Sequence, residues 1–265
     1  MAAKIVGICP AAGQGRRLGP VPGCKELFPV GFQAYDVGGQ TAYYPKAISQ
    51  YLIEGMVDAG AQEVFIILGQ GKHDIMNFYG DGGRFGVRIA YLYQEQLNGM
   101  PFALDLPYEW LDDSITLFGM PDTLIEPSDA FARLLAAHID REDDVTLGLF
   151  KTSRPQKFGM VELDQEHNIV YCIDKPDRTH LDYLWGLAVW NYRFTQLLHE
   201  FVSQSSAQGV TSEVVLSTVF SRAIALNFKV RGVPFEDGFY FDIGTADDLW
   251  LTMTHILKNK PIPGK

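Results

Sequence analysis

Glycines and cations are concentrated in one short stretch near the start of the chain, residues 9–19 (CPAAGQGRRLG). Small residues let the backbone come close to a ligand, and Arg16, Arg17 and Lys25 place three positive charges in a chain whose formal net charge is −10. Close backbone N–H groups, arginine and lysine suit the anionic oxygens of a nucleoside triphosphate. The stretch therefore predicts a phosphate-binding loop; glycine content alone leaves an ordinary connector as the lesser alternative, and the three cations weaken it further.

Two familiar glycine motifs do not fit this stretch. A dinucleotide-binding fingerprint has the spacing G-x-G-x-x-G at the start of a helix. Gly13 and Gly15 fit, but the third glycine is displaced by one position. Pro20 and Pro22 stand where the helix would have to run. A Walker loop fails as well, because the Gly-Lys pair at 71–72 lacks the Ser or Thr that should follow it.

Two aspartates follow predicted strands and are candidates for a metal site. Asp122 comes after residues 114–118 (SITLF), and Asp242 ends the run 239–241 (FYF). Carboxylates presented from strand ends near a triphosphate loop suit magnesium, which prefers oxygen ligands and retains water. Each aspartate alone is better explained as a cap of the following turn, whereas the pair beside a phosphate loop predicts a Mg²⁺ site.

Other reactive groups give weaker signals. Lys175, in the turn 174–176 (DKP), offers a point charge for a second phosphate, but by itself it is better explained as a solvated turn lysine. The six histidines are scattered, without the spacing of a transition-metal pair. No G-x-S-x-G segment is present, so serine hydrolase chemistry has no support.

Composition narrows the class of protein. A chain of 265 residues with 47% hydrophobic content can form one large domain over residues 1–265. The net charge of −10 argues against a nucleic-acid or membrane-surface binder. No apolar run approaches the ~20 residues that span a bilayer. Three cysteines without metal or disulfide spacing favour a reducing cytoplasm.

Alternating strand and helix patterns would position these groups. Strands are predicted at residues 4–8, 63–68, 87–93, 114–118, 145–150, 158–163, 169–173, 184–190, 229–233 and 239–242. Helices are predicted at residues 44–61, 75–79, 128–139 (with Ser128 as N-cap), 211–225 and 246–257. Strands separated by helices imply an α/β fold with a mainly parallel sheet, ligands at the carboxyl ends of its strands, and both halves in one sheet.

Several segments, in this order, match one known family. Residues 9–19 and 25–30 (KELFPV) are similar to its G-x-G-x-R-L and P-K-x-x-L-P-V signature. Residues 119–122 (GMPD) take the place of its G-D, and residues 242–245 (DIGT) correspond to its second metal-ligand segment. The chain resembles the sugar-1-phosphate nucleotidylyltransferases, most closely the glucose-1-phosphate thymidylyltransferases and the bacterial glucose-1-phosphate uridylyltransferases. The resemblance implies a Rossmann-like, three-layer mixed sheet of the nucleotide-diphospho-sugar transferase (GT-A-like) type. It also implies a single domain with a nucleotide-binding half (about 1–150) and a sugar-phosphate-binding half (about 151–265).

The resemblance also implies a role for each matching residue. The triphosphate would be held by Ala12, Gly13, Gly15, Arg17 and Lys25. The nucleobase would contact Gln94 and Gly99, and magnesium would be bound by Asp122 and Asp242. The sugar phosphate would be held by Lys175 in a pocket formed with Gly159, Asp174 and Gly186. The catalytic group would comprise Arg17, Lys25, Asp122 and Asp242.

The implied reaction is a Mg²⁺-dependent in-line attack of a sugar-1-phosphate on the α-phosphorus of dTTP or UTP, giving an NDP-sugar and pyrophosphate. Asp174 stands where the family usually has a glutamate, and this difference leaves the identity of the sugar undecided. One alternative is transfer to a non-sugar phosphate such as phosphocholine. Another is a silent nucleotide-sugar sensor, although such a protein would be expected to lack Lys25, Asp122 or Asp242. The resemblance further implies a cytoplasmic enzyme without nucleic-acid or membrane partners, with a dimer or tetramer as its possible assembly.

Overall fold

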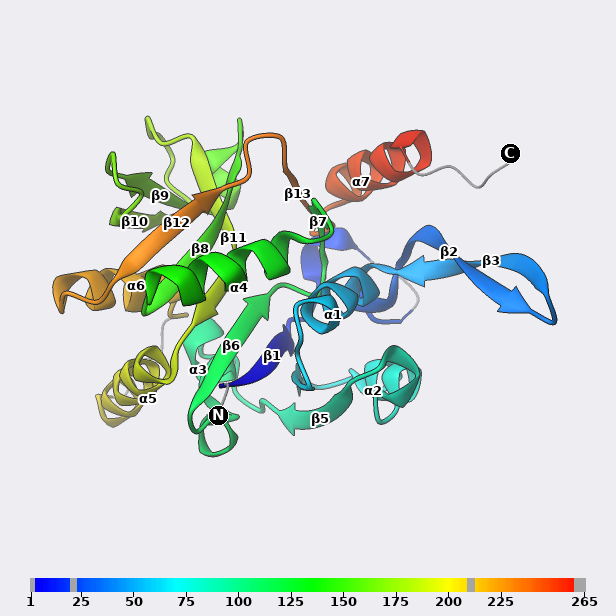
Figure 1. The fold of residues 1–265 in the computed structure, drawn as a ribbon, viewed down its shortest axis with the longest axis horizontal. Coiled ribbons are helices and arrows are strands. Elements are labelled where there is room, and N and C mark those ends of the chain that lie inside the picture. The colour runs from blue at the N-terminus through cyan, green and yellow to red at the C-terminus, as the bar shows by residue number, and fades with distance from the viewer. Residues whose placement is uncertain (1–2, 20–22, 209–212, 260–265) are drawn as a thin grey trace.

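A nine-stranded mixed sheet forms the centre of the molecule in the computed structural model, which describes residues 3–19, 23–208 and 213–259 (Figure 1). Its strands are β1 (Lys4–Ala11), β4 (Glu63–Leu68), β5 (Arg88–Tyr93), β6 (Ser114–Gly119), β8 (Val145–Lys151), β9 (Gly159–Leu163), β10 (Ile169–Asp174), β11 (Tyr183–Trp190) and β12 (Val230–Pro234). The main order is β10-β9-β11-β6-β1-β4-β5, and β8 pairs with β11 and β12. Strands β5, β4, β1 and β6 run parallel, so their carboxyl ends meet at one edge.

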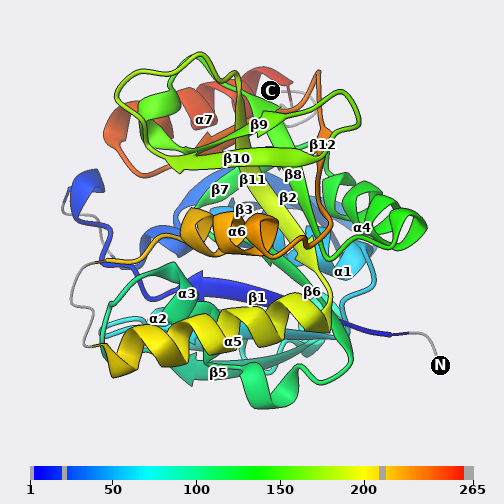
Figure 2. The same ribbon diagram turned by 90° about the vertical axis from the view of Figure 1, so that its left-hand side faces the viewer.

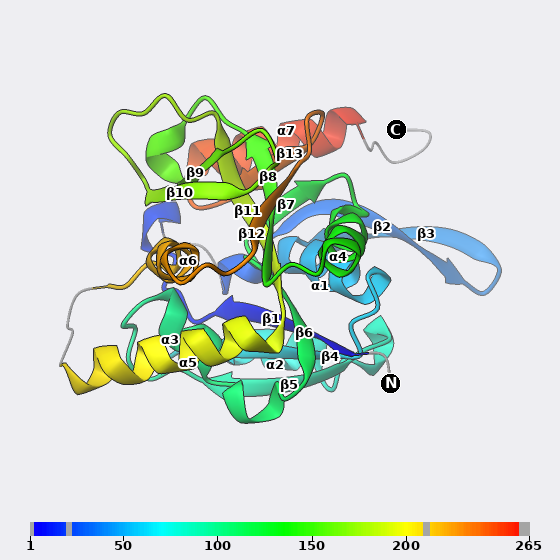
Figure 3. The same ribbon diagram turned by 60° about the vertical axis from the view of Figure 1, so that its left-hand side comes forward.

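Helices cover both faces of this sheet. One face is packed by α1 (Ile48–Asp58), α2 (His73–Tyr79) and α4 (Ala130–Arg141), and the other by α3 (Met100–Asp105), α5 (Tyr192–Ala207) and α6 (Leu216–Ala225). Figures 2 and 3 show α5 and α6 on the side of the sheet opposite α4 and α1. Side chains of β1 alternate between the two cores: Val6 and Ile8 face one, Cys9 and Ala11 the other. The predicted three-layer mixed α/β fold is confirmed.

A smaller unit completes the edge at which the parallel strands end. β7 (Thr123–Glu126) pairs antiparallel with β13 (Phe239–Asp242), and α7 (Ala246–Asn259) packs nearby over a small apolar core. This pairing places Asp242, the last residue of β13, opposite Thr123, the first residue of β7, so Asp242 stands beside the turn that carries Asp122 although the two aspartates are far apart in the chain.

A two-stranded ribbon projects from the body and was not predicted from the sequence. β2 (Pro29–Val37) and β3 (Gln40–Ala47) pair antiparallel around Gly38 and Gly39 and extend away from the sheet (Figure 1). The helix expected over residues 44–61 is therefore wrong at its start. Residues 44–47 pair with β2, and α1 begins only at Ile48. Adjacent glycines between two apolar runs are a hairpin signal that the helical spacing concealed.

Two other helix predictions needed correction, and one helix was missed. Ser128 is not an N-cap, because the N–H of Ala130 bonds to the carbonyl of Pro127 in a turn and α4 begins at Ala130. The helix expected over 211–225 begins at Leu216, and positions 211–212 lie outside the described residues. Helix α5 was not predicted, although Asn191 caps it by accepting a hydrogen bond from the N–H of Phe194 at 3.2 Å. Among the described helices, none combines the length and apolar character needed to cross a membrane.

Phe118 offers a test of the assigned core. Its side chain is fully buried in β6, with its ring 5.9 Å from that of Trp190. Phe118→Ala is expected to lower the free energy of unfolding by about 3–5 kcal/mol, because it leaves a cavity in a close-packed interior. Trp250→Ala removes a larger ring that is 66% exposed and should change stability by less than about 0.5 kcal/mol. Urea unfolding measures both, and equal losses would contradict the core.

Candidate functional site

A cleft of about 640 Å³ opens at the carboxyl ends of the parallel strands. The predicted residues that line it are Ala12, Gly13, Gly15, Arg17, Lys25, Gln94, Gly99, Asp122 and Lys175. They come from four separate loops: those after β1, β5 and β6, which the parallel strands bring to one edge of the sheet, and the loop after β10, which carries Lys175. Ligands are expected at such an edge in α/β sheets.

The glycine loop follows β1 directly and forms one wall of the cleft. Gly15 has a φ of +64°, a conformation that favours glycine, and its Cα lies against the side chain of Lys25. The loop continues into a single short turn of 3-10 helix, Arg16–Leu18. Within the described residues, no helix longer than this turn begins at the glycine loop, and the crossover helix between the parallel strands β1 and β4, α1, starts only at Ile48, in agreement with the exclusion of a dinucleotide-binding fingerprint. Arg17 is exposed at the end of the loop and lines the cleft.

An ion pair between Lys25 and Asp122 lies at the centre of the site. Lys25 Nζ donates to Asp122 Oδ2 at 2.5 Å, and both side chains are largely buried. Burial opposes the charged form of Lys25, but the carboxylates of Asp122, Glu26 and Asp242 outweigh it and raise the pKa of the lysine. The ammonium is therefore firmly charged and lies beside the glycine loop.

Asp242 supplies the second carboxylate of the site. Its Oδ1 accepts a hydrogen bond from the N–H of Gly244 at 3.0 Å, and the N–H of Ile243 donates to the carbonyl of Asp122. Burial, reinforced by the negative charge of Asp122, raises the pKa of Asp242, although the N–H of Gly244 and the charge of Arg17 oppose the shift. A cation between the two aspartates would relieve this repulsion.

The donor set fits Mg²⁺. Two carboxylates provide hard oxygen ligands, and Mg²⁺ takes its remaining ligands from water and substrate phosphates. Among the described residues, no cluster of three or more His, Cys, Asp or Glu side chains is arranged to hold a metal ion. Asp122 and Asp242 therefore suit a metal that binds together with its substrate rather than in a closed protein cage.

Gln94 and Gly99 follow β5, which lies at the opposite end of the row of parallel strands from β6, the strand that precedes Asp122. The N–H of Gln94 bonds to the carbonyl of Leu68 at 2.8 Å, which fixes its backbone beyond the end of β5. Its side-chain nitrogen is buried and has no hydrogen-bond partner among the described residues. Gly99 has a φ of +118°, and a side chain there would collide with the backbone of Val214. An unpaired buried donor in a cleft is a strong indication of a ligand acceptor.

The predicted sugar-phosphate residues divide into two groups. Lys175 lines the cleft, and its Nζ lies 3.5 Å from the carboxylate of Asp174. Asp174 pairs with Gly159 across β10 and β9. Gly159 packs closely against the indole of Trp185, and Gly186 packs against the ring of Tyr240. Close packing against aromatic rings accounts for both glycines without a ligand.

Two carboxylates in the cleft were missed from the sequence. Glu26 and Glu213 both line it. Glu26 could have been noticed as the neighbour of Lys25, but an acidic residue there does not suggest phosphate binding. Glu213 precedes α6 and reaches the cleft because Val214 bridges to Gly99, a long-range contact without a local sequence signal.

Asp248 joins the segment after Asp242 to the segment before β9. Lys157 Nζ donates to both of its oxygens, at 2.9 and 2.8 Å, and Arg154 Nη1 donates at 2.5 Å. The hydroxyl of Thr245 donates to it at 2.6 Å. Burial opposes ionisation, but these hydrogen bonds prevail and lower the pKa of Asp248.

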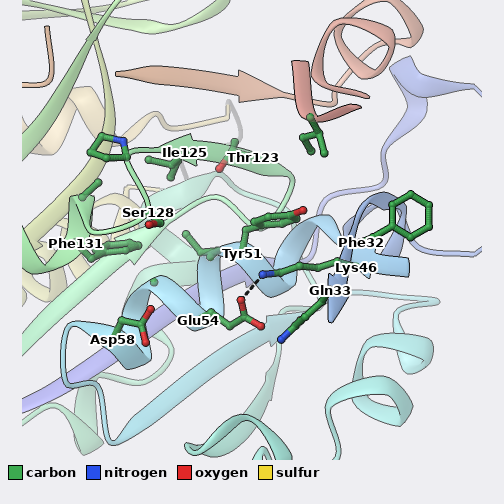
Figure 4. A pocket seen from close by; sticks show the side chains of 15 residues that line it. Phe32, Gln33, Lys46, Tyr51, Glu54, Asp58, Thr123, Ile125, Ser128 and Phe131 are labelled. Atoms are coloured by element: carbon green, nitrogen blue, oxygen red, sulfur yellow. Dashed lines mark hydrogen bonds and ion pairs between the residues drawn. The ribbon is translucent and has the colours of Figure 1, made fainter. Parts of the chain in front are cut away.

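A second hollow, of about 250 Å³, shares no lining residue with the cleft. Figure 4 shows it beside α1, with Lys46 turned toward Glu54, to which it is ion-paired. The Lys46 ammonium also lies 4.1 Å from the ring centroid of Tyr51. Lys46 is the one cation among the described lining residues, and Glu54 neutralises it, so the hollow is poorly suited to a triphosphate.

Known proteins resemble the chain over nearly its whole length. Residues 7–259 match the model of a family described as nucleotidyl transferase. A low-salt glycan biosynthesis nucleotidyltransferase (Agl11) of Haloferax volcanii is 27% identical over 64% of the chain, and a glucose-1-phosphate thymidylyltransferase of Neisseria meningitidis is 23% identical over 92%. The chain spans 44% and 79% of their respective lengths.

Two solved structures share the fold. A Bacillus anthracis protein provisionally named as a glucose-1-phosphate thymidylyltransferase, solved with a sucrose, superimposes with a TM-score of 0.80 at 19% identity, covering 98% of each chain. A UDP-glucose pyrophosphorylase complexed with UDP-glucose gives a TM-score of 0.76 at 15% identity, covering 97% of this chain and all of that one. At these identities, the likeness concerns the fold.

Asp248→Asn tests the junction at the edge of the site. Losing the carboxylate should lower the free energy of unfolding by about 1–3 kcal/mol near neutral pH, since its two cationic partners are only partly buried and can be rehydrated. The folded-state pKa of Asp248 is lowered, so its contribution is complete above its unfolded pKa of ~3.9. The difference from wild type should therefore shrink as pH falls below that value.

Thermal or urea unfolding at a series of pH values measures this difference. Asp247→Asn is the matched control, because Asp247 is the exposed neighbour in the same first turn of α7. A loss for Asp248→Asn no larger than that of the control, or one that grows toward acid pH, would contradict the assigned ion pairs.

Proposed function

Because the chain belongs to the nucleotidyl transferase family, we propose that it condenses a nucleoside triphosphate with a sugar-1-phosphate to give an NDP-sugar and pyrophosphate. The family predicted from the sequence is thereby confirmed. The observation that carries the proposed reaction is the Lys25–Asp122 ion pair. It has the glycine loop on one side and a second carboxylate, that of Asp242, on the other. Relatives named as glucose-1-phosphate thymidylyltransferases support the choice of substrates.

The chemistry requires positioning more than proton transfer. An oxygen of the sugar phosphate forms a bond to the α-phosphorus while the bond to the β-phosphate breaks and pyrophosphate leaves. The attacking oxygen is already anionic, so no general base is needed. The barrier arises from bringing two polyanions together, and fixed cations lower it.

Each cation has a place in this scheme. Arg17 is exposed on the glycine loop, where its guanidinium can bind the departing phosphates in a bidentate manner. Lys25 is held by Asp122 at the base of the cleft and can bridge that carboxylate to the phosphates. Lys175 reaches the cleft from the opposite half of the chain and can hold the sugar phosphate. Mg²⁺ bound by Asp122 and Asp242 would supply further positive charge to the reacting phosphates.

Gln94 favours a base that offers a carbonyl next to an N–H, and it disfavours adenine and cytosine, which lack this edge. Its unpaired buried nitrogen can donate to such a carbonyl, and its amide oxygen can accept from the N–H. Thymine, uracil and guanine share this edge, and the relatives named as thymidylyltransferases favour dTTP or UTP among them. Leaving such a donor unpaired costs about 1–3 kcal/mol, which a base carbonyl would recover.

A sugar phosphate fits the cleft better than phosphocholine. Quaternary ammonium groups are bound by aromatic side chains, and the described residues that line the cleft include no aromatic ring. They do include Glu213, and Asp174 lies beside the lining residue Lys175. Carboxylates in or beside the cleft can accept hydrogen bonds from sugar hydroxyls.

The deciding experiment measures pyrophosphate release with each nucleoside triphosphate crossed against a panel of sugar-1-phosphates and phosphocholine. Release with dTTP or UTP and a sugar-1-phosphate would support the proposal. Release with phosphocholine alone would favour the non-sugar alternative. No release with any pair, from protein that still binds a nucleotide or nucleotide-sugar, would favour a sensor.

Replacing either metal aspartate should reduce turnover. Asp122→Asn and Asp242→Asn are each expected to lower kcat by at least ~100-fold, because the reacting phosphates lose both a carboxylate-bound cation and its orientation. Steady-state rates over a Mg²⁺ titration measure the effect, with Asp247→Asn as the control. Near-normal activity of both variants at ordinary Mg²⁺ would exclude these residues as ligands.

The base-reading role of Gln94 has a separate signature. Gln94→Leu keeps the size of the side chain but removes its hydrogen bonds, and it is expected to raise KM for dTTP or UTP by about 10–100-fold. The preference for dTTP or UTP over ATP and CTP should fall by a similar factor. If KM and base preference both stayed unchanged, Gln94 would not contact the base.

A further inference from the structure

A buried ion pair between Lys72 and Glu26 lies against the wall of the cleft. Lys72 Nζ donates to both carboxylate oxygens of Glu26, at 2.9 and 2.7 Å. Lys72 is 6% exposed and Glu26 is 1% exposed, so neither charge is solvated. Burying two charges is costly, and the proposed chemistry assigns no task to either residue.

The segment that carries Lys72 contacts both parts of the phosphate grip, which comprises the glycine loop after β1 together with the turn Lys25–Leu27. Gly69 packs so closely on the glycine loop that a side chain there would lie 2.5 Å from the carbonyl oxygen of Ala12. The carbonyl of Gly71 accepts the Sγ–H of Cys24 at 3.7 Å. Together with Lys72, these contacts tie the loop after β4 to the loop after β1 and to the turn Lys25–Leu27.

The negative charge of Glu26 also influences the ionisation of its sequence neighbour, Lys25. Lys25 is surrounded by three carboxylates, those of Asp122, Glu26 and Asp242, and all three favour its charged form. Burial raises the pKa of Glu26, while the charges of Lys72 and Lys25 oppose the shift. Lys72 thus neutralises the carboxylate that would otherwise compete with Asp122 and the substrate for Lys25.

We propose that Lys72 is a positioning residue, which holds and neutralises Glu26 so that the ammonium of Lys25 is directed to Asp122 and the triphosphate. Lys25 is the other cation whose charge acts on the buried Glu26 carboxylate, so in the absence of Lys72 this carboxylate would draw Lys25 away from the cleft. The proposal rests on the function proposed above for its kinetic readout, but its binding readout does not depend on turnover.

The test compares four variants in the full-length chain. Lys72→Met removes the charge, and Lys72→Arg keeps it. The double variant Lys72→Met/Glu26→Gln removes both charges, so that no buried carboxylate competes for Lys25. Lys151→Met is the matched control, because it breaks a lysine–glutamate pair, with Glu236, that is exposed. Inorganic tripolyphosphate, titrated by calorimetry, serves as the probe for the phosphate grip.

Lys72→Met should lower kcat and tripolyphosphate affinity by at least ~10-fold each, because the phosphate-binding ammonium is misplaced. KM for the sugar-1-phosphate should change by less than about 3-fold, since Lys175 lies on the other half of the chain. Lys72→Arg and the double variant should recover most of both losses, and Lys151→Met should match wild type. If Lys72→Met does not fold, Lys72→Gln, which retains a donor to Glu26 without a charge, takes its place.

Wild-type values in Lys72→Met, or a double variant as impaired as Lys72→Met, would overturn the proposal. Losses spread equally over KM for both substrates and kcat would indicate general structural damage and would also overturn it. If wild-type protein binds tripolyphosphate but releases no pyrophosphate from any substrate pair, the proposed function fails, and the calorimetric arm still decides the role of Lys72.

Discussion

The Lys25–Asp122 ion pair joins two segments that lie 97 residues apart in the chain, and the geometry of the cleft depends on it. A largely buried lysine and aspartate cannot be separated without leaving an uncompensated charge, so the turn that carries Lys25 and the segment after β6 are held together. Two further ion pairs also join distant segments. Lys72 holds Glu26 across 46 residues, and Lys157 holds Asp248 across 91.

These ties explain how loops can form an ordered polar site. Loops have few apolar contacts of their own, and their position is set by the elements from which they extend. Here the parallel strands β5, β4, β1 and β6 deliver four loops to one edge, and ion pairs between loops then fix their side chains. Preorganised charges of this kind favour a reaction between two polyanions, because they need not reorganise as the new bond forms.

The contrast between the two hollows shows why charge, rather than concavity, identifies the site. Both are bounded by several elements, but in the hollow beside α1 the one cation, Lys46, is engaged by Glu54 and covered by Tyr51. In the cleft, Arg17 is exposed, and the amide nitrogen of Gln94 is buried without a partner in the described part of the chain. The cleft at the ends of the parallel strands therefore holds polar groups that remain available to bind a ligand.

The sequence by itself determined the strands of the central sheet and the loop that follows β1, because strand periodicity, small residues and proline positions act locally. It also indicated Lys25, Asp122 and Asp242 through their places beside strand ends. The tertiary structure decided what these residues meet. The pairing of β7 with β13 brings Asp242 toward Asp122, and the bridge at Gly99 brings Glu213 into the cleft. Such contacts join distant segments and have no local periodicity, so only the packed fold specifies them. The β2–β3 ribbon and the start of α1 likewise depend on backbone pairing that overrode a helical spacing.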